Sequence, residues 1–227
     1  MKVVMGLSGG MDSATLLGIL LEQGYDVHCC IFYYGSKHNK WENIAAQSVF
    51  EFYFKQGFSI TKYMMDISNI MKVFKSNLLL HCGDIPEGYY NDKSMSVTVV
   101  PERNFIFAGI MAGLAESIDA NAIALGVHQG DHYIYPDCRK EFIKALDTAI
   151  FLSSNCKVEV LAPLINDNKI TILKKGLECN PQVPYYLTRT CYKSQPVSCG
   201  KCGSCQERLE AFCELGIKDP IEYEGGQ

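Results

Sequence analysis

The chain has 227 residues, of which 48% are hydrophobic, and a formal net charge of −4. That length can bury one sizeable core with a small appendage, and the acidic balance argues against a large nucleic-acid-binding surface, which usually carries a basic stripe. By sequence, no apolar run reaches membrane-spanning length, and Met1 and Lys2 lead directly into a predicted strand without a signal peptide. We therefore expect a cytoplasmic protein.

The first predicted elements are a strand, a glycine turn and a helix. Val3 to Leu7 is short and apolar, which is typical of a strand buried on both faces of a parallel sheet. From Asp12 onward leucines recur at helical spacing, and Gly24 suits the C-cap. Residues 8–13 between them read SGGMDS, which is not a Walker A loop. Free N–H groups at the helix start favour a bound phosphate; the alternative is a plain turn without ligand.

Strands and helices alternate through the rest of the chain. The sequence predicts further strands at 27–33, 60–64, 122–126 and 158–164, and further helices at 41–54, 104–118, 142–152 and 169–177. Residues 75–100 are predicted to form a long loop or lid. This alternation indicates an α/β fold with a doubly wound parallel sheet, in which ligands bind beyond the carboxyl ends of the strands.

Cysteines provide the second strong signal. Seven of the eleven are scattered, whereas Cys191, Cys199, Cys202 and Cys205 form a C-x7-C-x2-C-x2-C cluster. Such a cluster in a reducing compartment indicates a metal site rather than disulfides. Four thiolates close a tetrahedral zinc shell, so the zinc would stabilise the fold and perform no chemistry; an iron–sulfur cluster is the alternative. We expect a nucleotide-binding domain over 1–183 and a small helical zinc-binding segment over 184–227.

These two signals together resemble the 7-cyano-7-deazaguanine synthase (QueC) family. SGGMDS resembles the pyrophosphate loop of the ATP pyrophosphatase (PP-loop) superfamily, whose adenine nucleotide alpha hydrolase-like fold is then expected. Further blocks of the chain agree with the family pattern. They are YGSKH at 34–38 (YGQRH in the family), VPERN at 100–104 (VPGRN), YPDCR at 135–139, APL at 162–164 followed by Lys169, and TCY at 190–192.

The resemblance implies an ATP-dependent ligase of queuosine biosynthesis. It would convert 7-carboxy-7-deazaguanine and ammonia into 7-cyano-7-deazaguanine through an adenylated carboxylate and an amide. Asp12 would also help to hold Mg²⁺. The ATP-binding residues would be Leu7, Ser8, Gly9, Gly10, Met11, Asp12, Ser13, Ala14 and Thr15. The catalytic residues would be Asp12, Arg103, Asp131, Arg139 and Lys169.

Arg103, Arg139 and Lys169 are candidates for clamping phosphate or the substrate carboxylate. The alternatives are structural. Arg139 could pair with Asp137 or Glu141, and Lys169 could be a solvated charge at a helix start. Cys138 is interpreted as a pocket-wall residue. His38 and Glu42 could form a local polar network or only a solvated helix start.

The chain also departs from the family pattern. Glu102 replaces a glycine, and residues 126–139 read GVHQGDHYIYPDCR where family members read closer to GVCETDFSGYPDCR. The larger Tyr133-Ile134 pair and the new His128 and His132 could change the acceptor. The alternative function is therefore a QueC-like ligase of antiviral defence that joins the acid to another amine, such as a protein N-terminus.

A tRNA thiolase of the same superfamily is disfavoured by the acidic balance and the closed four-cysteine spacing, and a non-enzymatic zinc module would not need the glycine loop. The expected partners are the small-molecule substrates 7-carboxy-7-deazaguanine, ATP and ammonia. We expect a homodimer, with no direct contact to nucleic acid or membrane.

Overall fold

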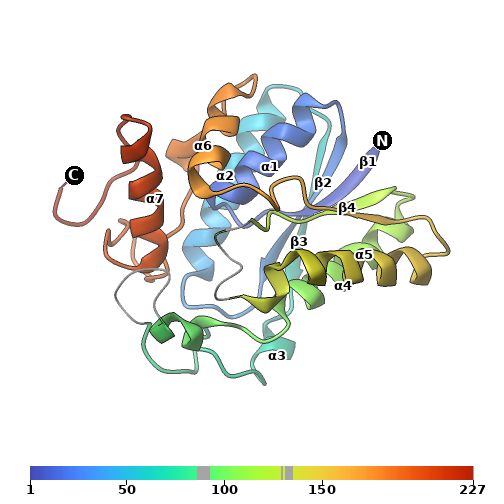
Figure 1. The fold of residues 1–227 in the computed structure, drawn as a ribbon, viewed down its shortest axis with the longest axis horizontal. Helices are drawn as coiled ribbons and strands as arrows, with labels where there is room; N and C mark the ends of the chain where they lie inside the picture. The colour runs from blue at the N-terminus through green and yellow to red at the C-terminus, as the bar shows by residue number, and fades with distance from the viewer. Residues whose placement is uncertain (86–92, 129, 131–134, 227) are drawn as a thin grey trace.

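The computed structural model describes residues 1–85, 93–128, 130 and 135–226 (Figure 1). A five-stranded sheet in the order β3-β2-β1-β4-β5 forms its centre, and every pair of neighbouring strands is parallel. The predicted α/β class is confirmed. The strands are β1 (Lys2–Gly6), β2 (Asp26–Tyr33), β3 (Ile60–Asp66), β4 (Ala122–Ala124) and β5 (Glu159–Leu161).

Helices cover both faces of this sheet (Figure 1). α1 (Met11–Glu22), α2 (Asn39–Lys55) and α6 (Lys169–Glu178) pack on one face, and α4 (Arg103–Ser117) and α5 (Lys140–Ser153) pack on the other. α7 (Gly203–Glu214) lies beside α6. The short elements are α3 (Ser68–Met71), η1 (Lys93–Thr98), η3 (Pro136–Cys138) and η4 (Tyr185–Leu187).

Two hydrophobic cores follow from the alternation of side chains along each strand. In β1, Val3 and Met5 join the core under α1, α2 and α6, whereas Val4 joins the core under α4 and α5. All three side chains are fully buried. Because both faces are covered, the strand is apolar at successive positions, and this explains why its sequence shows no alternation.

The predicted helices match the observed ones closely, but two strands are shorter than expected. β4 ends at Ala124, two residues before the predicted end, and β5 covers only Glu159–Leu161 of the predicted 158–164. After Ala124 the Leu125 N–H still donates to the carbonyl of Leu161 on β5, and Leu125, Gly126 and Val127 line a cavity. Leu125 and Val127 therefore belong both to the core and to the cavity wall.

One helical stretch in the described part of the chain, Ser96–Ser117, is long and apolar enough to cross a membrane by length and composition alone. This differs from the expectation drawn from the sequence. However, Ala108, Met111 and Ala115 in this stretch are buried in the core against the sheet. A helix that packs on a core passes the same test, so the stretch is weak evidence for a membrane span.

A buried ion pair fixes the C-terminal segment. Arg208 on α7 is fully buried, and its guanidinium donates hydrogen bonds of 2.6 and 2.8 Å to the Asp219 carboxylate. It also donates to Thr188 Oγ1 and to the carbonyl of Tyr185. Tyr223 donates its hydroxyl to the same carboxylate. These charge-assisted bonds satisfy a guanidinium that would otherwise be costly to bury.

Candidate active site

The glycine turn joins the carboxyl end of β1 to the N-terminus of α1. The Ser8 and Ser13 hydroxyls lie 3.0 Å apart, and the Gly10 N–H donates to Ser8 Oγ over 3.3 Å. Gly10 is the N-cap of α1, and no side chain caps this helix. Free helix N–H groups at the edge of a parallel sheet are suited to bind a phosphate.

Glycine occupies the two positions of the turn for different structural reasons. Gly9 has a φ of +78°, and a Cβ at this position would lie 2.4 Å from the backbone N of Ala46 on α2. Gly10 has an ordinary φ of −77°, and a Cβ there would lie 3.4 Å from Ser8 Oγ, its nearest neighbour. Gly9 is therefore required by the close approach of α2, whereas a Cβ at Gly10 would meet Ser8, Arg189 and Thr190 only at ordinary contact distances.

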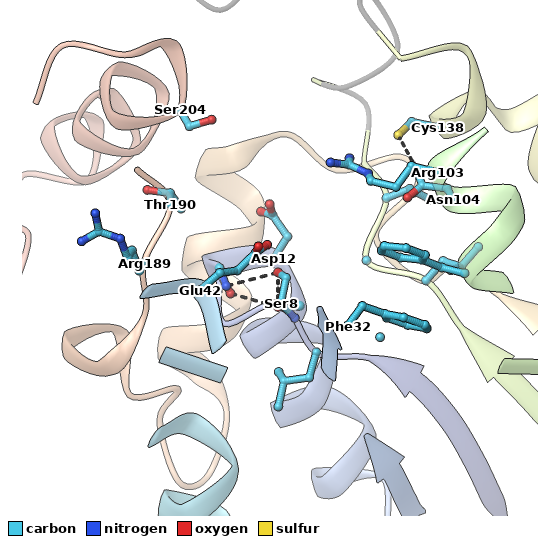
Figure 2. A pocket seen from close by; sticks show the side chains of 18 of the residues that line it. Ser8, Asp12, Phe32, Glu42, Arg103, Asn104, Cys138, Arg189, Thr190 and Ser204 are labelled. Carbon is cyan, nitrogen blue, oxygen red and sulfur yellow. Dashed lines mark hydrogen bonds between the residues drawn. The ribbon is translucent and has the colours of Figure 1, made fainter. Parts of the chain in front are cut away.

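A pocket opens above this turn (Figure 2). Its apolar wall includes Phe32 and Phe107, whose rings stack with centroids 4.0 Å apart. Figure 2 shows Arg103 and Arg189 on opposite sides of the pocket, with Ser8, Asp12 and Glu42 between them. The pocket thus combines an apolar slot, cationic side chains and an anion-binding turn.

Asp12 and Lys169 form an ion pair at this turn. Lys169 Nζ lies 2.9 and 2.8 Å from the two carboxylate oxygens of Asp12, 3.2 Å from Glu207 Oε2 and 3.2 Å from His128 Nε2. Burial opposes ionisation of Asp12, but the Lys169 ammonium and His128 outweigh it and hold the pKa of this carboxyl below its usual range. Lys169 is 9% exposed, so it is not a solvated charge at a helix start.

The blocks 100–104 and 135–139 meet on one wall of the pocket. The Asn104 N–H donates to Asp137 Oδ2 over 2.9 Å, and the Asn104 amide donates to Cys138 Sγ over 3.2 Å. The Arg103 guanidinium lies over the Tyr135 ring, 5.7 Å from its centroid. Arg103, Asn104, Tyr135 and Cys138 all line the pocket, so Cys138 is a pocket-wall residue as predicted.

One predicted site residue does not lie in this wall, and another is not described. Arg139 is exposed at the N-cap of α5, and the described lining of the pocket does not include it. Asp131 lies outside the residues that the structure describes, as do His132, Tyr133 and Ile134. The roles expected for Arg139 and Asp131 therefore remain predictions.

His38 and Glu42 form a polar network at the start of α2. Glu42 Oε2 lies 3.4 Å from His38 Nε2 and 3.4 Å from the Asn39 amide nitrogen. Asn39 Oδ1 in turn accepts from the backbone N–H groups of Tyr34 and Ser36. Burial, opposed by Arg103, raises the pKa of Glu42 to about 7, and burial together with Arg103 lowers the pKa of His38 to about 3. The alternative that these two residues form only a solvated helix start is excluded.

The segment before and within the cysteine cluster supplies pocket residues that sequence reasoning missed. They are Arg189, Thr190, Tyr192, Ser204 and Glu207. The backbone N–H of Arg189 donates to the carbonyl of Gly9 over 2.8 Å, which joins this segment to the glycine turn. Their position beside the cysteines was the sequence feature that could have identified them as pocket residues.

The four predicted cysteines come together. Their sulfur atoms all lie within 4.8 Å of one another, all four side chains are buried, and the group could hold a metal ion. Cys191 Sγ accepts the backbone N–H groups of Lys193 and Cys199. A hydrogen bond from Cys202, opposed by burial and reinforced by two backbone N–H groups, lowers the pKa of Cys199 to about 6. Hydrogen bonds that favour thiolates are suited to a metal centre.

Comparisons with known proteins agree on one family. A family model described as "Queuosine biosynthesis protein QueC" matches residues 2–216. A 7-cyano-7-deazaguanine synthase from Pseudoalteromonas atlantica is 43% identical over 223 residues, covering 98% of this chain and 99% of the relative. One from Caldicellulosiruptor bescii is 44% identical over 224 residues, covering 99% and 98%. One from Archaeoglobus fulgidus is 42% identical over 222 residues, covering 97% and 90%.

Solved structures support the fold. An NMN synthetase from Francisella tularensis superposes with a TM-score of 0.54 at 14% sequence identity, covering 95% of this chain and 77% of that one. At such low identity the likeness extends to the fold alone.

Proposed function

Because this chain belongs to the QueC family, we propose that it is an ATP-dependent 7-cyano-7-deazaguanine synthase. It takes 7-carboxy-7-deazaguanine, ATP and ammonia and forms the nitrile in two activation steps. The observation that carries the proposal is the pocket itself. It combines the SGGMDS turn with the 34–38, 100–104 and 190–192 segments, all of which match blocks of the family pattern.

The glycine turn is proposed to bind the triphosphate of ATP. N–H groups at the start of α1 and the Ser8 and Ser13 hydroxyls offer hydrogen bonds to phosphate oxygens. The slot beside Phe32 and Phe107 is suited to an adenine ring, because aromatic faces stack on such bases. Asp12, which is ionised and partly exposed, would hold the Mg²⁺ that enters with ATP and neutralises phosphate charge.

The cationic residues are proposed to align the reactants. Transfer of AMP to a carboxylate needs two anionic groups to approach each other, and positive side chains remove that repulsion. Arg103 on one wall and Lys169 beside the turn both line the pocket, which supports this role. The first activation gives the acyl adenylate and then the amide, and the second dehydrates the amide to the nitrile.

The cysteine cluster is proposed to hold structural zinc. Four buried sulfur atoms fill a tetrahedral shell and leave no open position for a substrate. Bound zinc would fix residues 191–205, and with them the Tyr192 and Ser204 side of the pocket. The metal therefore contributes to folding rather than to the reaction.

A direct assay tests the function. The protein is incubated with 7-carboxy-7-deazaguanine, ATP, Mg²⁺ and ammonium, and the products are identified by mass spectrometry. We expect the nitrile, with the amide as its precursor. Asp12→Ala should abolish turnover, because it removes the charge at the phosphate turn. Absence of any ATP consumption dependent on the acid would refute the proposal.

A second candidate is a QueC-like ligase that joins the activated acid to another amine, such as a protein N-terminus. It is favoured by His128, which is buried beside Lys169 at a position where the family pattern has cysteine. In the same assay this function would leave an acyl adenylate or an amide and no nitrile. Adding a peptide with a free N-terminus would then give a conjugate.

We also propose a cytoplasmic homodimer. Phe105 is 50% exposed, and its ring lies 6.4 Å from that of Phe142. An aromatic pair with one exposed ring on α4 and one partly buried ring on α5 is suited to an interface between copies. Sedimentation analysis of the wild type and of Phe105→Glu tests this, and a wild-type monomer at micromolar concentration would exclude it.

A further inference from the structure

We propose that Glu42 binds the ammonia that attacks the activated carboxyl group and accepts its proton, with His38 as a positioning residue. This inference rests on the proposed function. It assigns the ammonia site within the pocket and the base for the amide-forming step.

Glu42 lies at the phosphate end of the pocket. It precedes Ala46 by one helical turn on the same face of α2, and Ala46 is the residue that Gly9 of the turn approaches most closely. Figure 2 shows the Glu42 side chain in the same part of the pocket as Ser8 and Asp12. The carbonyl carbon of an acyl adenylate must lie next to the α-phosphate. A base beside the phosphate turn is therefore close to the reacting atom.

The pairing of the pocket carboxylates singles out Glu42. Among the described lining residues, Asp12, Glu42 and Glu207 carry carboxylates. Asp12 and Glu207 both contact the Lys169 ammonium. The hydrogen-bond and ion-pair partners of Glu42 in the described chain are instead His38 and the neutral Asn39 amide. Among the described residues Glu42 has no hydrogen bond or ion pair to a lysine or arginine, although the Arg103 charge acts on it from further away. With 18% of its side chain exposed, such a carboxylate is suited to a small cation such as ammonium.

The surroundings of His38 provide a second, independent observation. Its side chain is 8% exposed, yet its Nδ1 atom has no hydrogen-bond partner among the described residues. Its Nε2 atom faces Glu42 at 3.4 Å and the Tyr34 hydroxyl at 3.5 Å. An unsatisfied buried polar atom in the lining of a pocket is costly unless a ligand completes its bonding. His38 thus presents Nε2 to Glu42, and this contact supports its assignment as the positioning residue.

The charge of Glu42 suits a base at neutral pH. Burial raises its pKa to about 7, with Arg103 as the opposing influence. The other titratable groups that face it are Tyr34 after β2 and His38 on α2, and burial keeps both neutral. A general base is most effective when its pKa lies near the working pH, and it contributes about 10²- to 10⁴-fold to the rate.

The proposed step balances as follows. Ammonium binds to the Glu42 carboxylate and loses one proton through it to solvent, which leaves ammonia. The nitrogen lone pair forms the C–N bond at the carbonyl carbon, and the nitrogen becomes positively charged. Glu42 Oε takes one N–H proton. The C–O bond to AMP then breaks with its electron pair on the phosphate oxygen, giving the amide, AMP and a protonated Glu42.

The test separates activation from amide formation. Glu42→Gln keeps the size of the side chain and removes its charge. Two reactions are measured: exchange of labelled pyrophosphate into ATP dependent on the acid, and amide formation with ammonium. A third uses hydroxylamine, an amine that is largely unprotonated at pH 7 and needs less help from a base. Glu51→Gln, the same substitution on the exposed side of α2, is the matched control.

We expect Glu42→Gln to keep pyrophosphate exchange within about 3-fold of wild type and to lose about 10²- to 10⁴-fold in amide formation. Hydroxylamine should recover most of this loss, and Glu51→Gln should behave as wild type. If exchange falls in parallel with amide formation, Glu42 instead recognises the acid or ATP, and the inference is wrong. It is also wrong if the ammonium reaction keeps more than a tenth of its rate. Wild-type protein without acid-dependent exchange would refute the proposed function itself.

Discussion

Substitution by alanine should have different effects at the two glycines of the turn, lowering stability at Gly9 and ATP affinity at Gly10. Gly9→Ala places a Cβ 2.4 Å from the backbone N of Ala46, and it forces alanine into a φ of +78°. The left-handed conformation costs about 1–2 kcal/mol, and overpacking against backbone costs about 1–3 kcal/mol more. We expect Gly9→Ala to lower the free energy of unfolding by roughly 2–5 kcal/mol.

Gly10→Ala should instead fold normally and bind ATP poorly. At a φ of −77° and a ψ of 169°, alanine is unstrained, and its Cβ would meet Ser8 Oγ at 3.4 Å. The change in unfolding free energy should stay below about 1 kcal/mol. The added methyl group would lie beside Ser8, Arg189 and Thr190, next to the N–H groups that are proposed to bind phosphate. It should hinder the approach of phosphate, so ATP affinity should fall by at least about 10-fold.

Urea unfolding and calorimetric ATP titration of both variants measure these effects. If Gly10→Ala lowers the free energy of unfolding as much as Gly9→Ala does, the conclusion that only Gly9 is needed for folding is wrong. Unchanged ATP affinity in Gly10→Ala would show that phosphate does not approach this turn.

Three further outcomes are expected. Metal analysis should find about one zinc per chain, and Cys202→Ser should lose it and melt at a lower temperature; unchanged melting with selective loss of turnover would contradict a structural metal. Glu102→Gly should raise the unfolding free energy by about 0.5–1 kcal/mol, because Glu102 has a left-handed φ of 54°; urea unfolding would show a loss instead if Glu102 makes a needed contact. The pKa of Glu42 rises from 4.5 to about 7 on folding, so the folded protein holds this proton where the unfolded chain has released it. Stability should therefore fall by up to about 3 kcal/mol as pH rises from 5 to 8. Glu42→Gln should remove that part of the fall, and an identical pH dependence in the variant would oppose the assignment.

The sequence alone predicted the order and type of nearly all elements, because helical spacing and short apolar runs are local properties. The glycine turn and the cysteine cluster were also local patterns, and both form compact units. The ends of β4 and β5 were misplaced, since an apolar residue that lines a pocket looks the same in sequence as one in a strand. Leu125 is an example.

The pairing of side chains within the site was beyond sequence reasoning. Lys169 and Asp12 are 157 residues apart, and no local period relates them. His38 and Glu42 were noted as a possible network, but the Arg103 charge that acts on Glu42 and the Tyr192 ring beside His38 come from distant segments. Arg139 was selected because it stands in a family block, and its role stays a prediction because it does not line the described pocket.

The hydrogen bond from Arg189 to Gly9 has a consequence for how the enzyme matures in the cell. The turn emerges from the ribosome with β1, whereas Arg189, which donates the hydrogen bond to it, emerges about 180 residues later. Domains tend to organise from the amino end during translation. The glycine turn therefore lacks this hydrogen bond until the segment before the cysteines has been synthesised. On the proposed function, chains truncated before Arg189 should hydrolyse no ATP.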